Sequence, residues 1–288
     1  MTWLEHLGEG DLALMARVAA AAGFDGARLR HDDAAVESLL RRREAFAAVF
    51  EDHAPNDVVT NVTPFLTFAV LVHRVWDDLG TAAYVAEWMG PHQRLPVFDG
   101  SDLAEFAADP RRRLFITEML ASFTHVVSGV AWVPTRRGLR KQRFSELDPV
   151  RLASLLEVVN ERERAGIYRR LGDLALFLTG VFPDHTESHG FGAVAESRLL
   201  RSARLRVAHA PSSALPVPGA NGPVGLLEQL GARWYRLAAA TALGPLTGTM
   251  RVVTDVADRF GDVRRILNYL TDRYLLPYRG DWFGESAS

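Results

Sequence analysis

A short stretch near the middle of the chain, VFPDHTESHGFG over residues 181–192, gathers two histidines and two acidic residues within six positions. His185, Glu187 and His189 occupy every second position, and imidazole and carboxylate groups are ligands of zinc and non-haem iron. Pro183 and the flanking glycines favour a loop, in which an extended backbone would point the three side chains to one side. The stretch therefore predicts a metal site, or a catalytic site in which His185 and Glu187 handle protons. A polar turn that ends a buried helix is the alternative.

A second group of polar residues lies inside apolar segments with helical spacing. Glu118 and His125 fall near one stripe of the segment DPRRRLFITEMLASFTHVVSGVAW, and His73 and Asp77 form an i, i+4 pair in another. A histidine beside a carboxylate in a pocket can act as a general base. We therefore predict His125 and Glu118 as further catalytic residues. Ordinary helix-surface polarity with simple ion pairs is the alternative.

A third group consists of arginines that could bind an anion. Asp173 lies in the apolar run YRRLGDLALF, within reach of Arg169 and Arg170. Buried charges are costly unless they are paired, and perturbed charged groups collect at active sites. These three residues are predicted to contribute to substrate binding.

The densest cationic run lies in VPTRRGLRKQRFSEL, between Trp132 and Phe144. Its basic residues are Arg136, Arg137, Arg140, Lys141 and Arg143. Cations flanked by aromatic rings suit phosphate backbones or stacked bases. This basic loop, residues 136–143, is predicted to bind a phosphate-bearing substrate or RNA. A solvated loop is the alternative.

The composition excludes several classes of chemistry. The 288 residues include no cysteine, so disulfides, thiolate zinc sites and cysteine nucleophiles are ruled out. The first residues, MTWLEHLGEGDL, lack the basic start and apolar core of a signal peptide. The longest apolar stretch, around FLTFAVLVHRVW, is too short and too interrupted to span a bilayer. We expect a soluble, cytoplasmic protein without a membrane partner.

The net charge of −2 conceals an uneven distribution. Residues 1–110 contain 8 arginines against 18 acidic residues, whereas residues 111–206 contain 17 basic against 10 acidic residues. Arginine suits bidentate binding of phosphate or carboxylate, so the basic middle of the chain favours an anionic ligand. An acidic lobe packed on a basic lobe is the alternative.

The elements that would position these residues have helical periodicity nearly throughout. Three segments begin with a capping residue followed by proline, at Thr63–Pro64, Asp109–Pro110 and Asp148–Pro149. The segment 63–80 is apolar nearly all round, which predicts a central helix. No strand-like alternation is longer than RLRVAHA.

The predicted fold is a single all-α globular domain of about nine or ten helices. A main helical domain would cover 1–208, and a linker or lid rich in proline and glycine would cover 209–223. The remaining helices, 224–288, would pack on the main domain. Their first stripe is Val224, Leu227, Leu230, Trp234 and Leu237.

Residues 143–184, RFSELDPVRLASLLEVVNERERAGIYRRLGDLALFLTGVFPD, together with MLASFTHVVSGVAWV, resemble a family of uncharacterised prokaryotic proteins. The resemblance covers about the middle fifth of the chain. It implies no activity and assigns no site residues. It does mark this block as the functional core of the family, with the stretch 181–192 at its end.

These features predict an enzyme, specifically a transferase acting on a phosphate- or carboxylate-bearing substrate in an Arg-lined helical pocket. An RNA-linked substrate such as aminoacyl-tRNA would unite the pocket with the basic loop. A transferase is favoured because no obvious nucleophile or nucleotide-binding loop is present, and ALGPLTGTM lacks the GK[ST] ending. One alternative is a non-catalytic nucleic-acid-binding or regulatory protein that uses residues 136–143. Another is a metal-dependent hydrolase or oxidase that uses His185, Glu187 and His189. No cofactor is identified.

Overall fold

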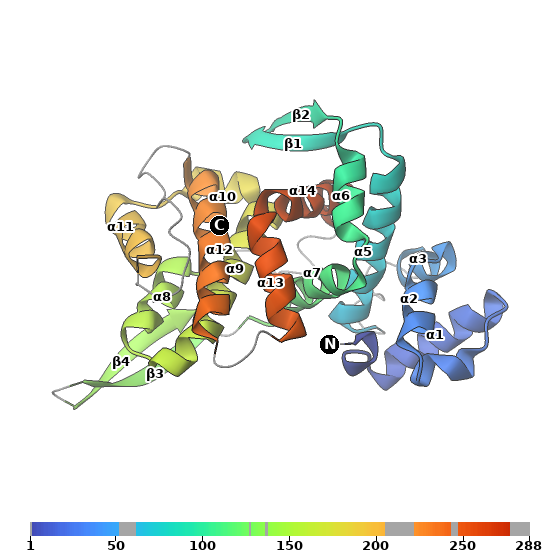
Figure 1. Cartoon of the computed structure of the whole chain (residues 1–288), viewed down its shortest axis with the longest axis horizontal. Helices are drawn as coiled ribbons and strands as arrows, with labels where there is room; N and C mark the ends of the chain where they lie inside the picture. The colour runs from blue at the N-terminus through green and yellow to red at the C-terminus, as the bar shows by residue number, and fades with distance from the viewer. Residues whose placement is uncertain are drawn as a thin grey trace. The chain divides into compact units, whose positions relative to one another are not determined.

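A computed structural model describes residues 2–51, 62–126, 128–135, 138–204, 222–242 and 247–276, with the backbone alone for the strand residues between 128 and 144. Over this part the chain is mostly helical, with 13 α-helices and two small two-stranded sheets (Figure 1). The predicted helical character is confirmed. The predicted count of nine or ten helices is too low, partly because the segment 32–50 is divided at Arg41–Arg42 into two helices.

The chain forms two compact units and passes between them four times. Unit 1 contains residues 1–86, 96–125 and 269–288, and unit 2 contains residues 87–95 and 126–268. This division differs from the predicted one at 209–223. Residues 209–221 of the predicted linker lie outside the described part of the chain, and its last two residues begin a helix.

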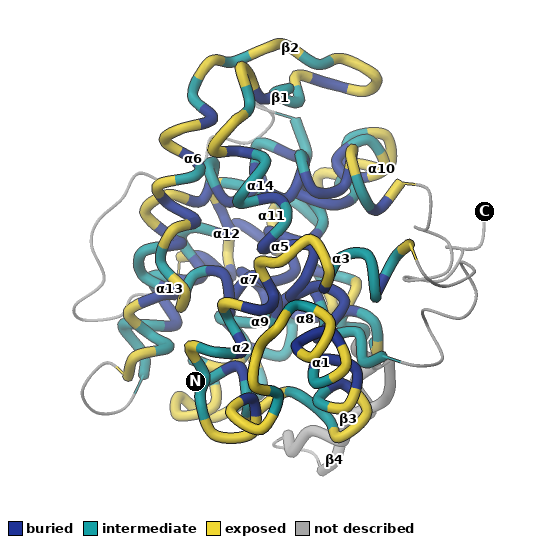
Figure 2. The backbone as a smooth tube through the Cα atoms, turned by 90° about the vertical axis from the view of Figure 1, so that its right-hand side faces the viewer, coloured by how far each residue is buried: buried dark blue, intermediate teal, exposed yellow. Residues whose placement is uncertain are grey.

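Unit 1 is built around one apolar helix. In chain order its elements are η1 (Trp3–Glu5), α1 (Glu9–Ala21), η2 (Gly26–Arg30), α2 (Asp33–Leu40), α3 (Arg43–Phe50), α5 (Pro64–Thr81), α6 (Gly100–Ala107), α7 (Pro110–Ser122) and η4 (Thr271–Leu275). Every side chain of α5 from Phe65 to His73 is buried, and the helix packs against α3, α6 and α7 (Figure 2). The predicted central helix is therefore confirmed. None of the helices in the described ranges has both the length and the apolar character that crossing a membrane requires.

Unit 2 is built on a pair of long helices that pack against each other. Its helices are α8 (Pro149–Ser154), η3 (Leu155–Glu157), α9 (Glu161–Val181), α10 (Pro183–His189), α11 (Ala193–Ser202), α12 (Gly222–Thr241), α13 (Gly248–Asp258) and α14 (Phe260–Leu270), whose last two residues belong to unit 1. The α9 helix lies along α12, and α13 and α10 pack on α12 (Figure 1). All five residues of the predicted α12 stripe are buried.

The predicted helix starts are confirmed by their capping bonds. The Thr63 hydroxyl accepts a hydrogen bond from the Leu66 N–H at 3.2 Å, ahead of α5. Asp109 and Asp148 accept backbone N–H groups in the same way at the starts of α7 and α8. Each of the three helices has proline at its first position, where no N–H is needed.

The strands form two pairs, which the predicted all-α class did not include. The first pair is β1 (Val85–Gly90) with β2 (Gln93–Val97), and the second is β3 (Ser128–Thr135) with β4 (Gly138–Ser145). In the second, antiparallel pair Ser128 lies opposite Ser145 and Thr135 opposite Gly138. The prediction of a loop is therefore wrong for 138–143, since the valines and aromatic residues on both sides favour strands. Arg136 and Arg137 lie outside the described residues.

Candidate functional site

The second half of α5 carries polar residues on two of its sides. After the buried run that ends at His73, the helix continues with Arg74, Asp77 and Asp78. Residues four apart lie on one side of a helix, so Arg74 pairs with Asp78, at 3.4 Å between Nε and Oδ1. His73 and Asp77 lie on another side. Each side belongs to a different polar network of unit 1.

A cavity of about 550 Å³ adjoins the first network. Asp78 and Thr81 at the end of α5 line it, together with Tyr84 and three alanines of the following segment. Its other wall consists of Tyr269, Asp272 and Arg273, from the end of α14 and from η4. All these residues belong to unit 1. The volume lies within the range of about 300–1,000 Å³ that is usual for small-molecule sites.

Asp78 has several polar partners beside this cavity. Its carboxylate accepts a hydrogen bond from the hydroxyl of Tyr274, and the Nε of Arg273 lies 3.3 Å from its Oδ2 atom. Arg74 also donates to the Tyr274 hydroxyl, at 3.3 Å. Burial and the bond to Asp78 raise the pKa of Tyr274, so its phenol stays protonated and keeps donating. These contacts hold the Asp78 carboxylate in place in the cavity lining.

The turn that carries Arg273 and Tyr274 is unusual. Residues Thr271–Leu275 form a π-helical turn at the end of α14. Such turns widen the helix by one residue and occur often at functional sites. Here the turn places Arg273 in the cavity lining and Tyr274 against α3, where its ring meets Phe46 edge-on at 5.7 Å between ring centres. Burial raises the pKa of Tyr269, which therefore also remains a neutral phenol.

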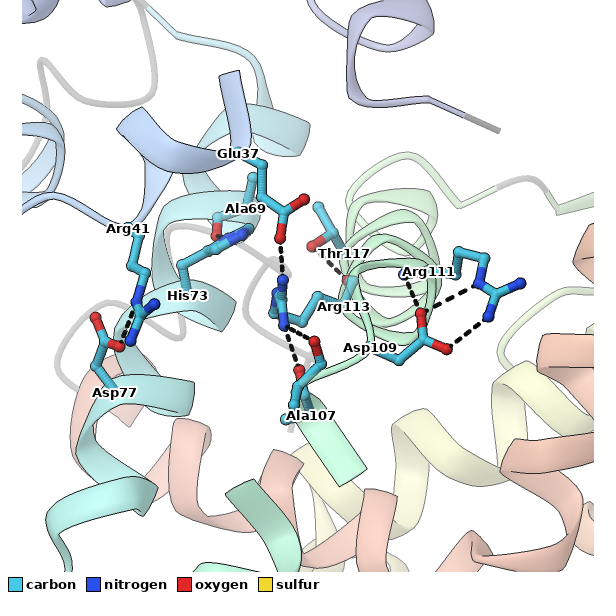
Figure 3. A network of polar contacts seen from close by, with 11 residues as sticks. Glu37, Arg41, Ala69, His73, Asp77, Ala107, Asp109, Arg111, Arg113 and Thr117 are labelled. Atoms are coloured by element: carbon cyan, nitrogen blue, oxygen red, sulfur yellow. Dashed lines mark hydrogen bonds and ion pairs between the residues drawn. The ribbon is translucent and has the colours of Figure 1, made fainter. Parts of the chain in front are cut away.

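The second network is centred on the buried Arg113, and its other charged groups are partly exposed (Figure 3). Arg113, which is only 1% exposed, donates to the carbonyl oxygens of Ala107 and Ala108 at the end of α6 and forms an ion pair with Glu37 of α2. The ring of Trp76 lies between two guanidinium groups. Its centre is 3.9 Å from the guanidinium carbon of Arg113 and 4.3 Å from that of Arg41. This network joins α2, α5, α6 and α7, and we assign it a structural role.

His73 lies within this second network and does not line the cavity. It is fully buried, and its Nδ1 lies 2.8 Å from the carbonyl oxygen of Ala69 (Figure 3). Burial and the nearby charges of Arg113 and Arg41 lower its pKa to about 3, so it is a neutral imidazole at ordinary pH. The predicted i, i+4 partner of His73, Asp77, instead forms an ion pair with Arg41 at 2.8 Å.

Glu118 and His125, the predicted catalytic pair, lie next to other groups in the structure. Helix α7 ends at Ser122, so His125 does not continue the stripe that includes Glu118. The Nε2 atom of His6 lies 2.8 Å from Oε1 of Glu118, and the His6 ring stacks on Phe65. His125 is exposed, with its Nδ1 3.0 Å from the hydroxyl of Thr124. Neither residue lines the cavity.

The predicted loop around 183–189 is wrong, because these residues form the short helix α10. Pro183 occupies the first turn of this helix, a position at which proline is favoured as it is in loops. On a helix the i, i+2 positions diverge. The rings of His185 and His189 stack 4.0 Å apart, whereas Glu187 accepts the N–H of Val224 at 3.2 Å. In the described part of the chain no group of three or more His, Cys, Asp or Glu side chains is arranged to hold a metal ion.

Two of the predicted substrate-binding arginines, Arg169 and Arg170, lie beside carboxylates of unit 2. Arg169 lies 3.9 Å from Asp173, as predicted, and the buried Tyr235 donates to Asp173 at 2.8 Å. Burial raises the pKa of Asp173 despite these partners. Arg170 forms an ion pair with Glu146 at 3.1 Å, and its charge also acts to lower the pKa of Asp173. Of Arg140 only the backbone is described, in β4, and Arg136 and Arg137 lie outside the described residues.

No protein-family model, curated protein or solved structure matches this chain. The resemblance of residues 143–184 to a prokaryotic family therefore stays a prediction. The candidate site depends on the geometry of the cavity alone. None of its polar lining residues was among the predicted site residues, which came from histidine and arginine patterns elsewhere in the chain.

Proposed function

We propose that this protein binds a small polar organic molecule in the cavity beside Asp78. The observation that carries the proposal is the convergence of charged, aromatic and small apolar groups around about 550 Å³. Binding sites of this kind combine apolar walls with a few placed polar groups, which fix the orientation of the ligand.

The side chains of the cavity divide into two roles in this proposal. Asp78 and Arg273 would contact the polar groups of the ligand, and the rings of Tyr84 and Tyr269 would form its apolar walls. Arg74 and Tyr274 are positioning residues, because they hold the Asp78 carboxylate without lining the cavity. An aromatic ring such as that of Tyr84, which is 53% exposed, can lose further exposed area when a ligand binds.

From the sequence, the ligand of such a cavity is expected to be the substrate of an enzyme. The transferase activity and the RNA-linked substrate stay predictions. Ligand binding in this cavity offers a way to test them. The cavity differs in one respect from the expected Arg-lined pocket, since its lining contains Arg273 together with two acidic residues and none of the predicted arginines.

The test is to fill the cavity. Ala83 lines it and is exposed, so Ala83→Trp adds bulk there without overpacking the core. We expect that small polar fragments which bind the wild-type protein in ligand-observed NMR lose their signal with this variant. Ala13→Trp, at an exposed alanine of α1, is the matched control and should retain them. Fragments that bind both variants equally, or no binding to the wild-type protein, would contradict the proposal.

A second candidate function, nucleic-acid binding, is favoured by a separate observation. Much of the predicted basic loop belongs to an antiparallel ribbon, in which Arg140 lies opposite Val133 and Arg143 opposite Val130 in the backbone register. Figure 1 shows β3 and β4 extending away from the helices of unit 2. A two-stranded ribbon can enter the major groove of a DNA duplex, and cations along it can pair with phosphates.

Salt dependence tests this second candidate. Binding to a fluorescent DNA duplex of about 20 base pairs should weaken as salt rises, with a log–log slope of about −0.9 for each phosphate neutralised. The double variant Arg140→Ala with Arg143→Ala should reduce the size of that slope by about 2. Arg198→Ala with Arg251→Ala, at exposed arginines of the same unit, is the control. An unchanged slope in the ribbon variant would rule out this use of the hairpin.

A further inference from the structure

The cavity lies at the carboxyl-terminal ends of two helical elements. Thr81 is the last residue of α5, and Tyr269, Asp272 and Arg273 belong to the last turns of α14 and η4. Carbonyl groups at such ends carry a partial negative charge, which favours cations. The lining adds two carboxylates, those of Asp78 and Asp272, against one guanidinium. The charges around the cavity therefore favour a positively charged group.

A cation from the chain itself already lies there. The Nε of Arg273 is 3.3 Å from Oδ2 of Asp78, and its guanidinium carbon lies 5.8 Å from the ring centre of Tyr269 and 5.9 Å from that of Tyr274. A carboxylate with aromatic rings on the other side is the usual environment of a bound organic cation. Arg273 thus marks the position at which this cavity accommodates a guanidinium group.

Arg273 is held weakly enough to be exchanged. Its side chain is 57% exposed, and exposed ion pairs contribute little stability because water screens them and long side chains lose entropy. Asp78, by contrast, is 12% exposed and keeps its contacts to Arg74 and Tyr274 when Arg273 moves away. Departure of Arg273 would therefore leave a fixed, partly buried carboxylate facing the cavity.

We propose that the ligand of this cavity is an organic cation, with an ammonium or guanidinium head that binds between Asp78 and Tyr269 in place of Arg273. This inference rests on the proposed function, since it names the class of the ligand in the same cavity. Arg273 acts as an internal competitor that the ligand displaces. A carboxylate ligand would instead need Arg273 as its partner, and would approach it beside two carboxylates and two helix ends of like sign.

The two classes of ligand predict opposite effects of one substitution. For a cationic ligand, Arg273→Gln removes the group that competes with it. For an anionic ligand, the same substitution removes its binding partner. Three probes with the same butyl chain distinguish them in calorimetric titrations: butylguanidinium, the neutral butylurea of nearly the same shape, and the carboxylate pentanoate. We expect butylguanidinium alone to bind, and to bind about three- to fivefold more tightly to Arg273→Gln, the range set by loss of the exposed contacts of Arg273 to Asp78 and Tyr274. Arg17→Gln, at an exposed arginine of α1, should leave the affinity unchanged.

Substitution of the carboxylates completes the test. Asp78→Asn should weaken butylguanidinium binding about tenfold or more, and Asp272→Asn should weaken it several-fold through its exposed charge. Asp272→Asn keeps the test valid if Asp78→Asn does not fold. Weaker or unchanged binding to Arg273→Gln would overturn the inference, as would no binding of butylguanidinium to either protein. Pentanoate binding that Arg273→Gln abolishes would also overturn it, while leaving the cavity as a ligand site.

Discussion

His73 of α5 is a buried base whose titration should make the protein sensitive to acid. Its pKa is lowered to about 3, chiefly by burial, from an ordinary value of 6.5. Between these two values the unfolded chain binds a proton that the folded protein does not, so stability falls as the pH falls. One such group should cost about 2 kcal/mol of the free energy of unfolding between pH 7 and pH 5.

The His73→Leu variant isolates this contribution. When the pH is lowered from 7 to 5, this variant should lose about 2 kcal/mol less of its free energy of unfolding than the wild-type protein, as measured by urea denaturation. His31→Gln, at an exposed histidine, should retain the wild-type loss. The prediction fails if the His73→Leu and wild-type proteins respond to pH in the same way.

At the scale of single residues, sequence patterns identified partners only where these are close in the chain. The approach of Arg169 to Asp173 was predictable, because residues four apart share one side of a helix. The bond between Tyr274 and Asp78 was not, because it joins residues 196 positions apart. No local pattern indicates which distant helix such a side chain will meet.

The packing of α9 against α12 requires glycine at position 172. A Cβ atom added at Gly172 would lie 2.5 Å from two ring carbons of Tyr235. That ring cannot move away easily, because it is fully buried and its hydroxyl donates to Asp173. We expect Gly172→Ala to destabilise the protein by about 1–3 kcal/mol, although alanine is the better helix former.

Gly166 of the same helix provides the matched control. A Cβ atom there would meet nothing within 4 Å, so Gly166→Ala should stabilise the protein by about 0.5–1 kcal/mol through helix propensity alone. Thermal and urea unfolding should show that Gly172→Ala lowers the stability of the protein and that Gly166→Ala raises it. Stabilisation by Gly172→Ala would show that the two helices are packed less closely than the structure indicates.

At the scale of elements, local signals predicted helix starts better than strands. The Thr63–Pro64 pair and its two counterparts were recognisable, since capping and proline act within a few residues. The β1–β2 pair was missed because Pro96 lies inside β2 and the apolar residues of the pair do not alternate strictly. At α10, Pro183 was compatible with a loop or a first helical turn, and only packing against α9 and α12 decides between them.

At the scale of the whole molecule, the sequence placed a boundary where the fold does not divide. The proline- and glycine-rich stretch 209–223 suggested a linker after a self-contained domain 1–208. Each compact unit instead uses chain from both sides of that stretch. Unit 1 includes η4 with Tyr274 and Leu275, and unit 2 includes α12, which covers α9. Composition indicates where a chain is not regular, but not which segments on either side pack together.

The fragment 1–208 should therefore not fold as a stable domain. Removing the rest of the chain takes α12 with its fully buried Trp234 and Tyr235 from unit 2. It also takes from unit 1 the tyrosine that holds Asp78. Exposing these apolar faces costs more than the few kcal/mol by which a domain is stable. We expect weak helical circular dichroism and rapid proteolysis of the fragment, compared with the full chain. A protease-resistant fragment with cooperative unfolding would instead support the boundary suggested by composition.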